Sequence, residues 1–462
     1  MAAHEYDLVF LGGGPAGYQG AIRAAQLGQK VAVIEDTNLG GVCLNQGCIP
    51  TKAIRASAEI LNQARLAKDY GIVISEARPD MNAIINRKNR IVTFLREEVA
   101  NLFAANKITL YNGRGKFISP QEIRINESGP VVKGSKMVIA TGSRPRIPPA
   151  FANPIPGVVT SEAMLDIDKL PETLLIIGGG IVGLEIASIM AALGSQVTVL
   201  EERAQMLPKE DRETVAYLEE IMRSQGIKMI NAATEVEARA QTQDGVTVTL
   251  ANGDTHTAQL VMLAAGRIPN TADIGLENTG LDYAGDFIPV NEYMETEVKN
   301  IFAAGDVVGG WLLAHVAFME GIIVAEYTAG LPNSMDYRVV PRCLFTFPEF
   351  ASVGLPEEEA KQLYPAQAFT YPLRNHGMAQ ALGAADGMVK LVVNTMTGEI
   401  LGGHVIGPHA SELVSEIALA MRNKVMPSGI INTIHIHPTM AEAVLEVAQA
   451  SSRKSIHTMP RS

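Results

Sequence analysis

Two cysteines in a glycine-flanked run are the residues of this sequence that most clearly point to chemistry. Cys43 and Cys48 are separated by four residues, and Lys52 lies four positions beyond the second cysteine. Two thiols within bridging distance can close to a disulfide, reopen to a dithiol and pass two electrons to a neighbouring acceptor. A zinc half-site would need a second Cys or His pair at finger-like spacing, whereas the chain has one further cysteine, Cys343. We therefore expect a redox-active pair, with Cys343 as a buried small apolar residue.

A histidine–glutamate pattern near the C-terminus is a candidate acid–base pair. The segment reads His435-Ile436-His437-Pro438-Thr439-Met440-Ala441-Glu442. Thiol–disulfide exchange needs a group that takes a proton from a thiol and later returns it, and histidine titrates in the right range. Glu442, in the first turn of an expected helix, could orient the His437 ring. The alternative is a His-x-His metal pair with Glu442 as third ligand, but nothing else in the sequence completes such a site, and we expect no metal.

Two copies of one strand–turn–helix–strand pattern must position these groups. Residues 6–11 read as a buried strand that enters the turn Gly12-Gly13-Gly14-Pro15-Ala16-Gly17, and a second strand ends at Glu35. The pattern recurs with Gly178-Gly179-Gly180-Ile181-Val182-Gly183 and Glu201, and the first glycine precedes the acid by 23 positions in both copies. In such a unit the glycines allow a tight turn and close approach to a pyrophosphate, while the acid binds a ribose hydroxyl. Two units imply two dinucleotides.

The stretches around the two units complete the expected architecture. Helical periodicity runs roughly over residues 52–105. Strands that end in Ala140-Thr141-Gly142 and at Gly266 lead out of the two units, and the proline-rich segment 145–156 reads as a linker.

Two further features follow the second unit. An apolar strand ends at Asp306, whose carboxylate suits a sugar hydroxyl. Leu313-Ala314-His315 then opens a helix whose N-terminal amides could face anionic charge. From about residue 340, strands alternate with amphipathic helices and show no nucleotide pattern.

Together these motifs resemble the pyridine nucleotide–disulfide oxidoreductases, a family of flavoenzymes, over essentially the whole chain. The resemblance implies an α/β fold with two Rossmann-type dinucleotide-binding domains, one for FAD and one for NAD, and an α+β C-terminal dimerisation domain. The expected bounds are 1–147 for the FAD domain, 148–270 for the NAD domain, 271–340 for a central segment that completes the FAD site, and 341–462 for the dimerisation domain.

The resemblance also assigns catalytic roles. Cys43 would be the interchange thiol that meets the substrate, and Cys48 the thiol that contacts the flavin. Lys52 would stabilise the electron-rich reduced ring, with Glu185 as its counter-charge.

His437, oriented by Glu442, would act as the base for the disulfide of the opposite subunit, which implies an obligate homodimer. The residues expected to bind FAD are Gly12, Gly14, Pro15, Ala16, Gly17, Glu35, Gly41, Lys52, Gly115, Ala140, Thr141, Gly142, Asp306, Leu313, Ala314 and His315. The residues expected to bind NAD are Gly178, Gly180, Ile181, Val182, Gly183, Glu201 and Gly266.

The choice of nicotinamide narrows the reaction within the family. Glu201, followed by Glu202, suits the ribose diol of NAD and repels a 2′-phosphate, although Arg203 keeps NADPH open. Together with the cysteine pair and the histidine motif, this choice resembles that of the members of the family that oxidise protein-bound dihydrolipoyl groups to lipoyl with NAD+, and that is the reaction the resemblance implies. The lipoyl group would arrive on a separate carrier protein of a 2-oxo acid dehydrogenase complex or of the glycine cleavage system. The alternative is an NAD(P)H-dependent reductase of another disulfide, similar to the glutathione reductases. A hypothesis of another class is a flavin-binding scaffold whose disulfide is only structural. Lys52 and His437 argue against it, because a scaffold needs neither a base nor a lysine that stabilises the reduced flavin.

Composition excludes other classes of function. The net charge of −11 over 462 residues argues against nucleic acid as a partner, because phosphate binding needs a basic surface. No apolar run is long enough to span a bilayer, so no membrane is expected. Three cysteines in the chain is cytosolic usage, and no signal or transit peptide is visible. We expect a cytoplasmic enzyme.

Overall fold

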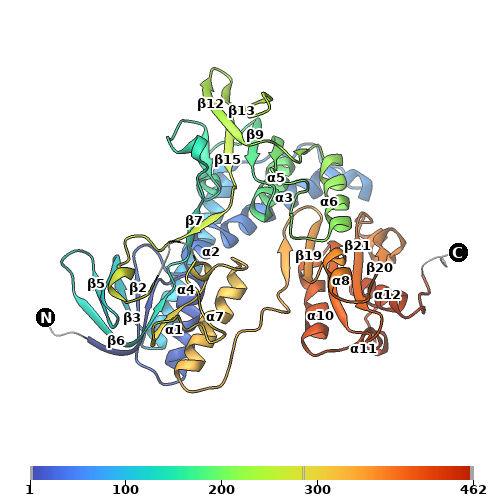
Figure 1. Cartoon of the computed structure of the whole chain (residues 1–462). Coiled ribbons are helices and arrows are strands. Elements are labelled where there is room, and N and C mark those ends of the chain that lie inside the picture. Colours follow the sequence, from blue (N-terminus) through green and yellow to red (C-terminus); the bar gives the residue numbers. More distant parts are fainter. Residues whose placement is uncertain (1–3, 283–284, 286, 458–462) are drawn as a thin grey trace.

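The computed structural model describes residues 4–282, 285 and 287–457 of the chain. Within that part, three α/β units lie side by side, each built on its own main sheet (Figure 1). The first two main sheets have parallel cores and the third is antiparallel. The expected fold class is thereby confirmed, with two Rossmann-type units and an α+β C-terminal unit.

The first unit is a sheet of order β3-β2-β1-β6-β5-β4, to which β17 adds by pairing with β6. Leu11 at the end of β1 lies opposite both Ile34 of β2 and Ile139 of β6. These central strands are apolar and buried because both faces of the sheet are covered. Helices α1, α4 and α7 pack on one face, and strands β4 and β5 pack with Ile274 and Leu276 on the other. The elements are β1 (His4–Leu11), α1 (Pro15–Gln26), β2 (Val31–Glu35), α2 (Gly41–Gln46), α3 (Cys48–Leu66), η1 (Ala67–Tyr70), α4 (Met81–Ala105), β3 (Thr109–Asn112), β4 (Gly115–Ser119), β5 (Glu122–Ile125), β6 (Val131–Ile139), β17 (Ile301–Ala303), η5 (Asp306–Val308) and α7 (Ala314–Thr328).

The helical periodicity over residues 52–105 belongs to two helices, α3 and α4. Helix α3 passes into η1, and residues 71–80 separate it from α4. Gly71 ends the first part in a left-handed conformation, which glycine adopts without strain. Asp80 then starts α4, because its carboxylate accepts a hydrogen bond from the Ala83 N–H at 3.0 Å.

The second unit repeats the design of the first with an all-parallel sheet of order β11-β10-β9-β15-β8. An antiparallel sheet of β12, β13 and β14 extends it, and the short ladder between β7 and β16 lies where the chain passes between the two units. The elements are β7 (Ser143–Pro145), β8 (Val158–Thr160), β9 (Thr173–Ile177), α5 (Ile181–Leu193), β10 (Gln196–Leu200), α6 (Arg212–Ser224), β11 (Lys228–Ile230), β12 (Val236–Thr242), β13 (Gly245–Leu250), β14 (Thr255–Ala258), β15 (Leu260–Leu263) and β16 (Arg267–Pro269).

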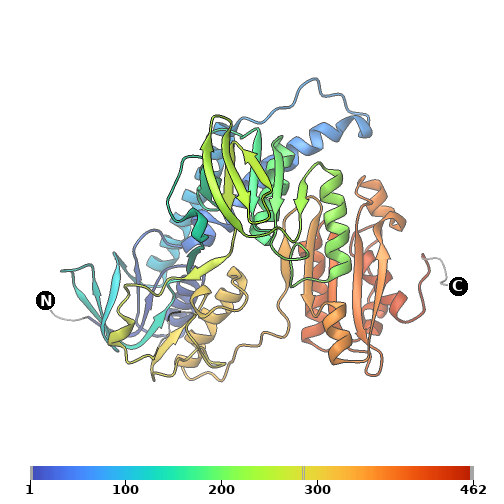
Figure 2. The ribbon, with the colours of Figure 1, turned by 45° about the horizontal axis from the view of Figure 1, so that its top comes forward.

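The third unit is an antiparallel sheet of order β18-β19-β22-β21-β20 flanked by helices. Figure 2 shows helix α6 of the second unit beside this sheet, and α6 contacts β22. No helix in the described ranges is long and apolar enough to cross a membrane. The elements are β18 (Arg342–Leu344), β19 (Glu349–Gly354), α8 (Glu357–Leu363), β20 (Ala366–Pro372), α9 (Gly377–Ala381), β21 (Met388–Asn394), β22 (Ile400–Gly407), α10 (Ala410–Arg422), α11 (Pro427–Asn432) and α12 (Glu442–Ser451).

Candidate active site

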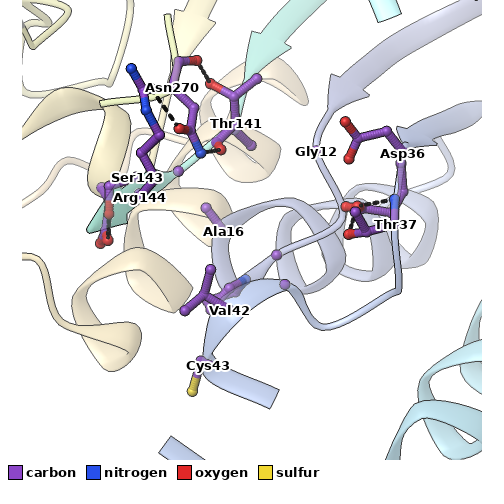
Figure 3. A pocket seen from close by; sticks show the side chains of 18 of the residues that line it. Gly12, Ala16, Asp36, Thr37, Val42, Cys43, Thr141, Ser143, Arg144 and Asn270 are labelled. Atoms are coloured by element: carbon purple, nitrogen blue, oxygen red, sulfur yellow. Dashed lines mark hydrogen bonds between the residues drawn. The ribbon is translucent and has the colours of Figure 1, made fainter. Parts of the chain in front are cut away.

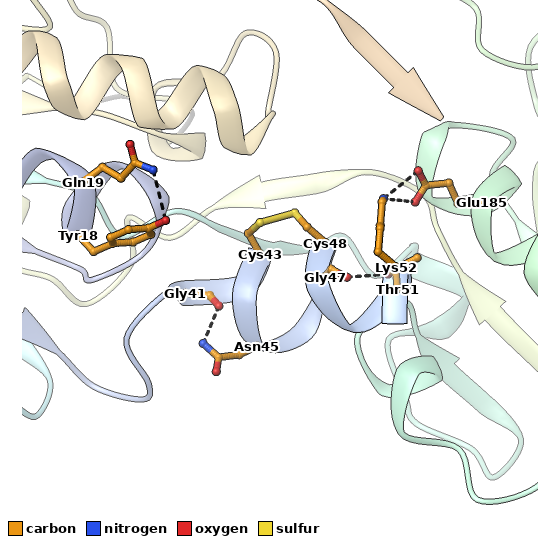
Figure 4. Close-up of a disulfide and its surroundings, with 10 residues drawn as sticks. All are labelled: Tyr18, Gln19, Gly41, Cys43, Asn45, Gly47, Cys48, Thr51, Lys52 and Glu185. Atoms are coloured by element: carbon orange, nitrogen blue, oxygen red, sulfur yellow. Dashed lines mark hydrogen bonds and ion pairs between the residues drawn. A yellow bond between two sulfur atoms is a disulfide. The ribbon is translucent and has the colours of Figure 1, made fainter. Parts of the chain in front are cut away.

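Two helices placed end to end bring the two cysteines together. Cys43 lies in α2 and Cys48 is the first residue of α3, and their Cα atoms are 4.7 Å apart and joined by a disulfide (Figure 4). Gly47 is the hinge between the helices, and its carbonyl accepts a hydrogen bond from the Thr51 hydroxyl at 2.6 Å. Asn45 fixes α2 by donating to the Gly41 carbonyl at 2.9 Å. The expected pairing of the cysteines is confirmed.

A lysine and a glutamate from different units meet one helical turn beyond Cys48. The Lys52 ammonium lies 3.0 Å and 2.9 Å from the two carboxylate oxygens of Glu185 in α5. The Phe345 N–H donates to Glu185 at 2.8 Å, and the Phe345 ring centroid is 4.1 Å from Lys52 Nζ. The ammonium is thus held between a nearly buried carboxylate and an aromatic face. The sequence analysis did not find Phe345, because only the fold brings the start of the third unit to α3.

A cavity of about 750 Å³ begins at the end of β2 and reaches the disulfide. Figure 3 shows Thr37 and Cys43 among its lining, together with Thr141 and Ser143 from the strands that lead out of the first unit. Of the residues expected to bind FAD, those that line it are Gly12, Gly14, Pro15, Ala16, Glu35, Gly41, Gly115, Ala140, Thr141, Gly142, Asp306 and Ala314. Gly17, Lys52, Leu313 and His315 are not among the lining residues, and the His315 ring bonds to the Pro341 carbonyl at 2.8 Å instead.

The shape of this cavity depends on glycines in and beside its lining, around the start of α1. A Cβ on Gly12 would lie 2.2 Å from the Ala140 oxygen, one on Gly17 would lie 1.9 Å from the Gly12 oxygen, and one on Gly41 would lie 2.6 Å from the Gly14 Cα. The bare backbone leaves the start of α1 open to the cavity, where the helix dipole favours a pyrophosphate.

The acid at the end of β2 stands at one end of the cavity. Glu35 accepts hydrogen bonds from the Gly13 N–H at 2.7 Å and the Thr37 N–H at 2.9 Å, which fix its carboxylate at the cavity wall where a ribose diol can reach it. A helix start for a pyrophosphate, an acid for a ribose and a volume in the range of cofactor pockets fit FAD.

Asp306 lies at the cavity wall within a small polar cluster. The Ser143 hydroxyl bonds to its Oδ2 at 2.5 Å, and the Arg267 Nε lies 2.6 Å from the same hydroxyl and 3.7 Å from Oδ2. Ser143 and Arg267 directly follow the motifs of Gly142 and Gly266, but their meeting depends on the ladder between β7 and β16, which the sequence did not predict.

The second unit reproduces the turn geometry of the first. A Cβ on Gly178 would lie 2.3 Å from the Ala264 oxygen, and one on Gly183 would lie 2.0 Å from the Gly178 oxygen. Glu201 accepts hydrogen bonds from the Gly179 N–H at 2.7 Å and the Arg203 N–H at 2.9 Å, as Glu35 does in the first unit. Gly180 caps α5, so Ile181, Val182 and Gly183 form its first turn. Gly266, with φ 102°, lies three residues beyond β15 and directly before β16.

The environment of Glu201 bears on the choice of nicotinamide. The exposed Arg203 side chain lies 3.4 Å from the carboxylate of Glu202, which offsets its positive charge. The group beside the ribose position is therefore a fixed carboxylate, which suits a diol and repels a phosphate.

The histidine–glutamate pair lies in the third unit. His437 Nδ1 is 2.9 Å from a carboxylate oxygen of Glu442, the first residue of α12. Burial opposes ionisation of Glu442, but hydrogen bonds from the Thr439 N–H and the His437 ring lower its pKa below the ordinary value. The ionised carboxylate holds the ring by Nδ1 and leaves Nε2 for other partners. His435 bonds to Glu416 instead, at 3.0 Å.

Neither member of the pair lines the cavity of its own chain. The His437 side chain is 81% exposed in the protomer. Among the described residues, no group of three or more His, Cys, Asp and Glu is arranged to hold a metal ion. Cys343 is partly rather than fully buried against the core of the third unit, and burial raises the pKa of its thiol.

Comparisons with known proteins agree with this geometry. The family model described as pyridine nucleotide-disulphide oxidoreductase matches residues 6–321, and the model of the dimerisation domain of that family matches residues 340–448. The chain is 41% identical to the dihydrolipoyl dehydrogenase of Chlamydia muridarum over 98% of both chains. It is 39% identical to that of Bacillus subtilis, over 98% of this chain and 100% of the relative.

Solved structures of similar proteins share the whole fold. LpdA from Mycobacterium tuberculosis superposes with a TM-score of 0.90 at 29% identity, over 96% of this chain and 99% of that one. The HOCl-induced flavoprotein disulfide reductase RclA from Escherichia coli superposes with a TM-score of 0.87 at 29% identity, over the same shares of the two chains. With both family models and the full-length relatives in agreement, this chain belongs to the pyridine nucleotide–disulphide oxidoreductase family.

Proposed function

We propose that this chain works as a dihydrolipoyl dehydrogenase, which oxidises protein-bound dihydrolipoyl groups to lipoyl with NAD+. The observation that carries the proposal is the Cys43–Cys48 disulfide at the end of a cavity that fits FAD. Full-length relatives of that name, about as long as this chain, support it. As a member of its family, the chain uses FAD and NAD.

The exchange step balances within the substrate and the two cysteines. One substrate thiolate attacks the sulfur of Cys43, which breaks the Cys43–Cys48 bond and releases the Cys48 thiolate. The second substrate thiol then attacks the substrate sulfur of the mixed disulfide, closes the lipoyl ring and releases the Cys43 thiolate. The substrate is oxidised by two electrons and the cysteine pair is reduced by two. FAD, which the start of α1, Glu35 and Asp306 would hold in the cavity, would supply the acceptor for these two electrons and the hydride chemistry with NAD+.

Protons and charge are handled by the chain's own groups. His437 takes the proton of the attacking thiol, and Glu442 keeps its ring in the required orientation. Lys52, fixed by Glu185 one turn beyond Cys48, places a positive charge on the side of the site where electrons accumulate.

The base acts in a homodimer. The flanking Ile434 and Ile436 are 97% and 78% exposed in the protomer, so the segment around His437 presents an apolar surface. A second copy placed on this surface would cover it and bring His437 to the disulfide of its partner. The match to the family's dimerisation domain supports this arrangement.

The remaining assignments concern cofactor choice and partners. We assign NAD rather than NADP, because Glu201 is fixed at the ribose position and Arg203 is offset by Glu202. The substrate is a lipoyl carrier protein of a 2-oxo acid dehydrogenase complex or of the glycine cleavage system. Three cysteines, two of them in the redox pair, support a cytoplasmic location.

Steady-state oxidation of NADH by lipoamide tests the proposal, with oxidised glutathione and NADPH assayed in parallel. We expect turnover with lipoamide and NADH, no turnover in Cys43→Ser, and a fall in kcat of about 10²–10⁴-fold in His437→Ala. His435→Gln is the control, because that ring bonds to Glu416 and should leave kcat nearly unchanged. Faster turnover of oxidised glutathione with NADPH would favour the alternative reductase. Flavin reduction by NADH without turnover would exclude both.

A further inference from the structure

Glu320 is a buried carboxyl that none of the assigned roles uses. It lies in the middle of α7 and is 2% exposed. One of its oxygens accepts the Gly305 N–H at 2.6 Å, and the other accepts the Tyr337 hydroxyl at 2.6 Å. Within the described ranges, no Lys, Arg or His forms an ion pair with it. A buried carboxyl without a cation is costly to ionise, so its place needs a reason.

The first of these bonds fixes the backbone that carries Asp306. Gly305 directly precedes Asp306 and has φ 82°, in the left-handed region that glycine adopts without strain. On the cavity side, the Asp306 carboxylate bonds to the Ser143 hydroxyl. The N–H one residue earlier bonds to Glu320, which does not line the cavity. The turn is therefore held by Ser143 at the cavity and by Glu320 outside the cavity lining.

The second bond ties this turn to the strap, which we define as residues 331–341. Figure 1 shows the strap running from α7 toward β19 of the third unit. Its Met335 N–H bonds to the Glu292 carbonyl at 2.8 Å, and its Asp336 forms an ion pair with Arg422 of α10. Tyr337 is the next residue after Asp336. Glu320 thus lies between the flavin-site turn and a segment that the dimerisation domain holds.

We propose that Glu320 is a positioning residue of the flavin site, which fixes the Gly305–Asp306 backbone and ties it to the strap. The proposal rests on the cavity being the FAD site. It concerns how this chain holds Asp306 and does not concern the substrate.

The geometry accommodates both protonation states. The ionised carboxylate accepts both hydrogen bonds. In the neutral form, the oxygen facing Tyr337 carries the proton and donates it to the phenol oxygen. The phenol proton then turns to the Met294 sulfur, 3.8 Å from that oxygen. The bond from Gly305 persists in both states, so the proton changes the charge near Asp306 without releasing the turn.

Burial places this protonation near neutral pH. Burial, with a smaller contribution from the negative charge of Asp306, raises the pKa of Glu320 to about 7, although the hydrogen bonds from Tyr337 and Gly305 act in the opposite direction. Tyr337 stays protonated because burial raises its pKa. The nearby Asp336 is bound to Arg338 and Arg422, and Arg267 lies on the cavity side of Asp306.

The test uses the holoenzyme with three variants. Glu320→Leu leaves the Gly305 N–H buried without a partner, Glu320→Gln keeps an acceptor but cannot ionise, and Tyr337→Phe removes one bond to the ionised form. Glu326→Gln is the matched control for the loss of ionisation, because it makes the same change later in α7 at a carboxylate that bonds to Arg23 and to Asn333 of the strap rather than to Gly305. FAD release is followed by the recovery of flavin fluorescence, and the visible flavin band is titrated from acid to alkaline pH.

We expect FAD to leave Glu320→Leu about tenfold faster than wild type. The wild-type flavin band should show a step with a midpoint near pH 7, which persists in Glu326→Gln and is lost in Glu320→Gln. In Tyr337→Phe the midpoint should move to higher pH, because a bond that favours the ionised form is gone. A wild-type step retained in Glu320→Gln, or unchanged FAD release in Glu320→Leu, would overturn the proposal. If Glu320→Leu does not fold, the other two variants decide. An enzyme that shows these effects but does not turn over lipoamide would contradict the proposed function alone.

Discussion

The ammonium of Lys52 is held by one carboxylate, and this single contact can be tested. Both oxygens of Glu185 lie within 3.0 Å of Lys52 Nζ, and the Phe345 N–H bonds to the same carboxylate. In Glu185→Gln the lysine loses its counter-charge and its fixed position. We expect the rate of flavin reduction by dihydrolipoamide, measured by stopped-flow absorbance, to fall about tenfold, since a partly buried charge-assisted contact is worth roughly 1.5 kcal/mol.

The control for this variant lies on the same helix as Lys52. Glu59 of α3 is 43% exposed and pairs with Arg55, which also pairs with Glu349. Glu59→Gln should therefore leave the rate within a factor of two, because a partly solvated pair on one helix is worth only about 0.4 kcal/mol. Equal rates in the two variants would show that the position of Lys52 does not depend on Glu185.

At the residue scale, local motifs predicted the groups whose chemistry depends on sequence neighbours. Cys43 with Cys48, and His437 with Glu442, are close along the chain, and their contacts follow from one helix start or turn. The contact between Ser143 and Asp306 could not be predicted, because it joins residues 163 positions apart. Glu320 shows no signal either, since its role depends on a backbone N–H and a tyrosine that only the packing of α7 brings together.

At the element scale, the same distinction holds for strands and helices. The glycine turns predicted β1, α1 and β2, and again β9, α5 and β10, because each unit is continuous in sequence. Strand β17 joins the first sheet by pairing with the C-terminal end of β6, from Met137 to Ile139. This pairing is long-range, and no local sequence pattern predicts it. The break between α3 and α4 was missed because residues 71–80 include apolar residues such as Ile72 and Val73, which are exposed in the protomer.

The crossing of α1 and α7 is the element contact most sensitive to size. A Cβ on Gly321 of α7 would lie 2.1 Å from the backbone oxygen of Ala16, which lines the cavity. Gly321→Ala must therefore push the two helices apart, at a cost of about 1–3 kcal/mol. We expect a lower Tm and less than one bound FAD per chain after purification, measured by scanning calorimetry and flavin absorbance.

A glycine without close neighbours provides the comparison. Gly377 in α9 has no heavy atom within 4 Å of an added Cβ, and its φ is not in the left-handed region. Gly377→Ala should leave Tm unchanged or slightly higher, since alanine favours a helix by up to about 1 kcal/mol. If Gly321→Ala kept the wild-type Tm and FAD content, the close crossing would not limit the cavity.

At the scale of the whole molecule, the second and third units are joined by a buried charged network. Lys390 of β21 is fully buried, and its ammonium contacts Asp211 at 3.0 Å, Glu213 at 2.7 Å and Glu357 at 2.7 Å. Asp211 caps helix α6 and is also fully buried. Removing one member of such a pair leaves the other charge buried without a partner, which strongly destabilises the fold. Replacing both members by apolar residues of similar size costs much less.

Lys390→Met should therefore destabilise the joint between the units by about 3–5 kcal/mol, and Lys390→Met with Asp211→Asn should recover part of that loss.

The pKa of Asp211 sets the pH range of this effect. Burial alone would raise that pKa, but nearby positive charge and hydrogen bonds lower it to about 2. The ionised Asp211 carboxylate therefore contributes fully to the free energy of unfolding above its ordinary pKa. This contribution is lost only as the pH falls through about 2. Scanning calorimetry should give the same Tm deficit for Lys390→Met at pH 6, 7 and 8. Lys361→Met removes a 55% exposed ammonium from Glu357 and leaves the Lys390 contacts in place, so it should change Tm little. A double variant no more stable than the single one would show that the cost comes from lost packing around Lys390 rather than from the stranded charge of Asp211.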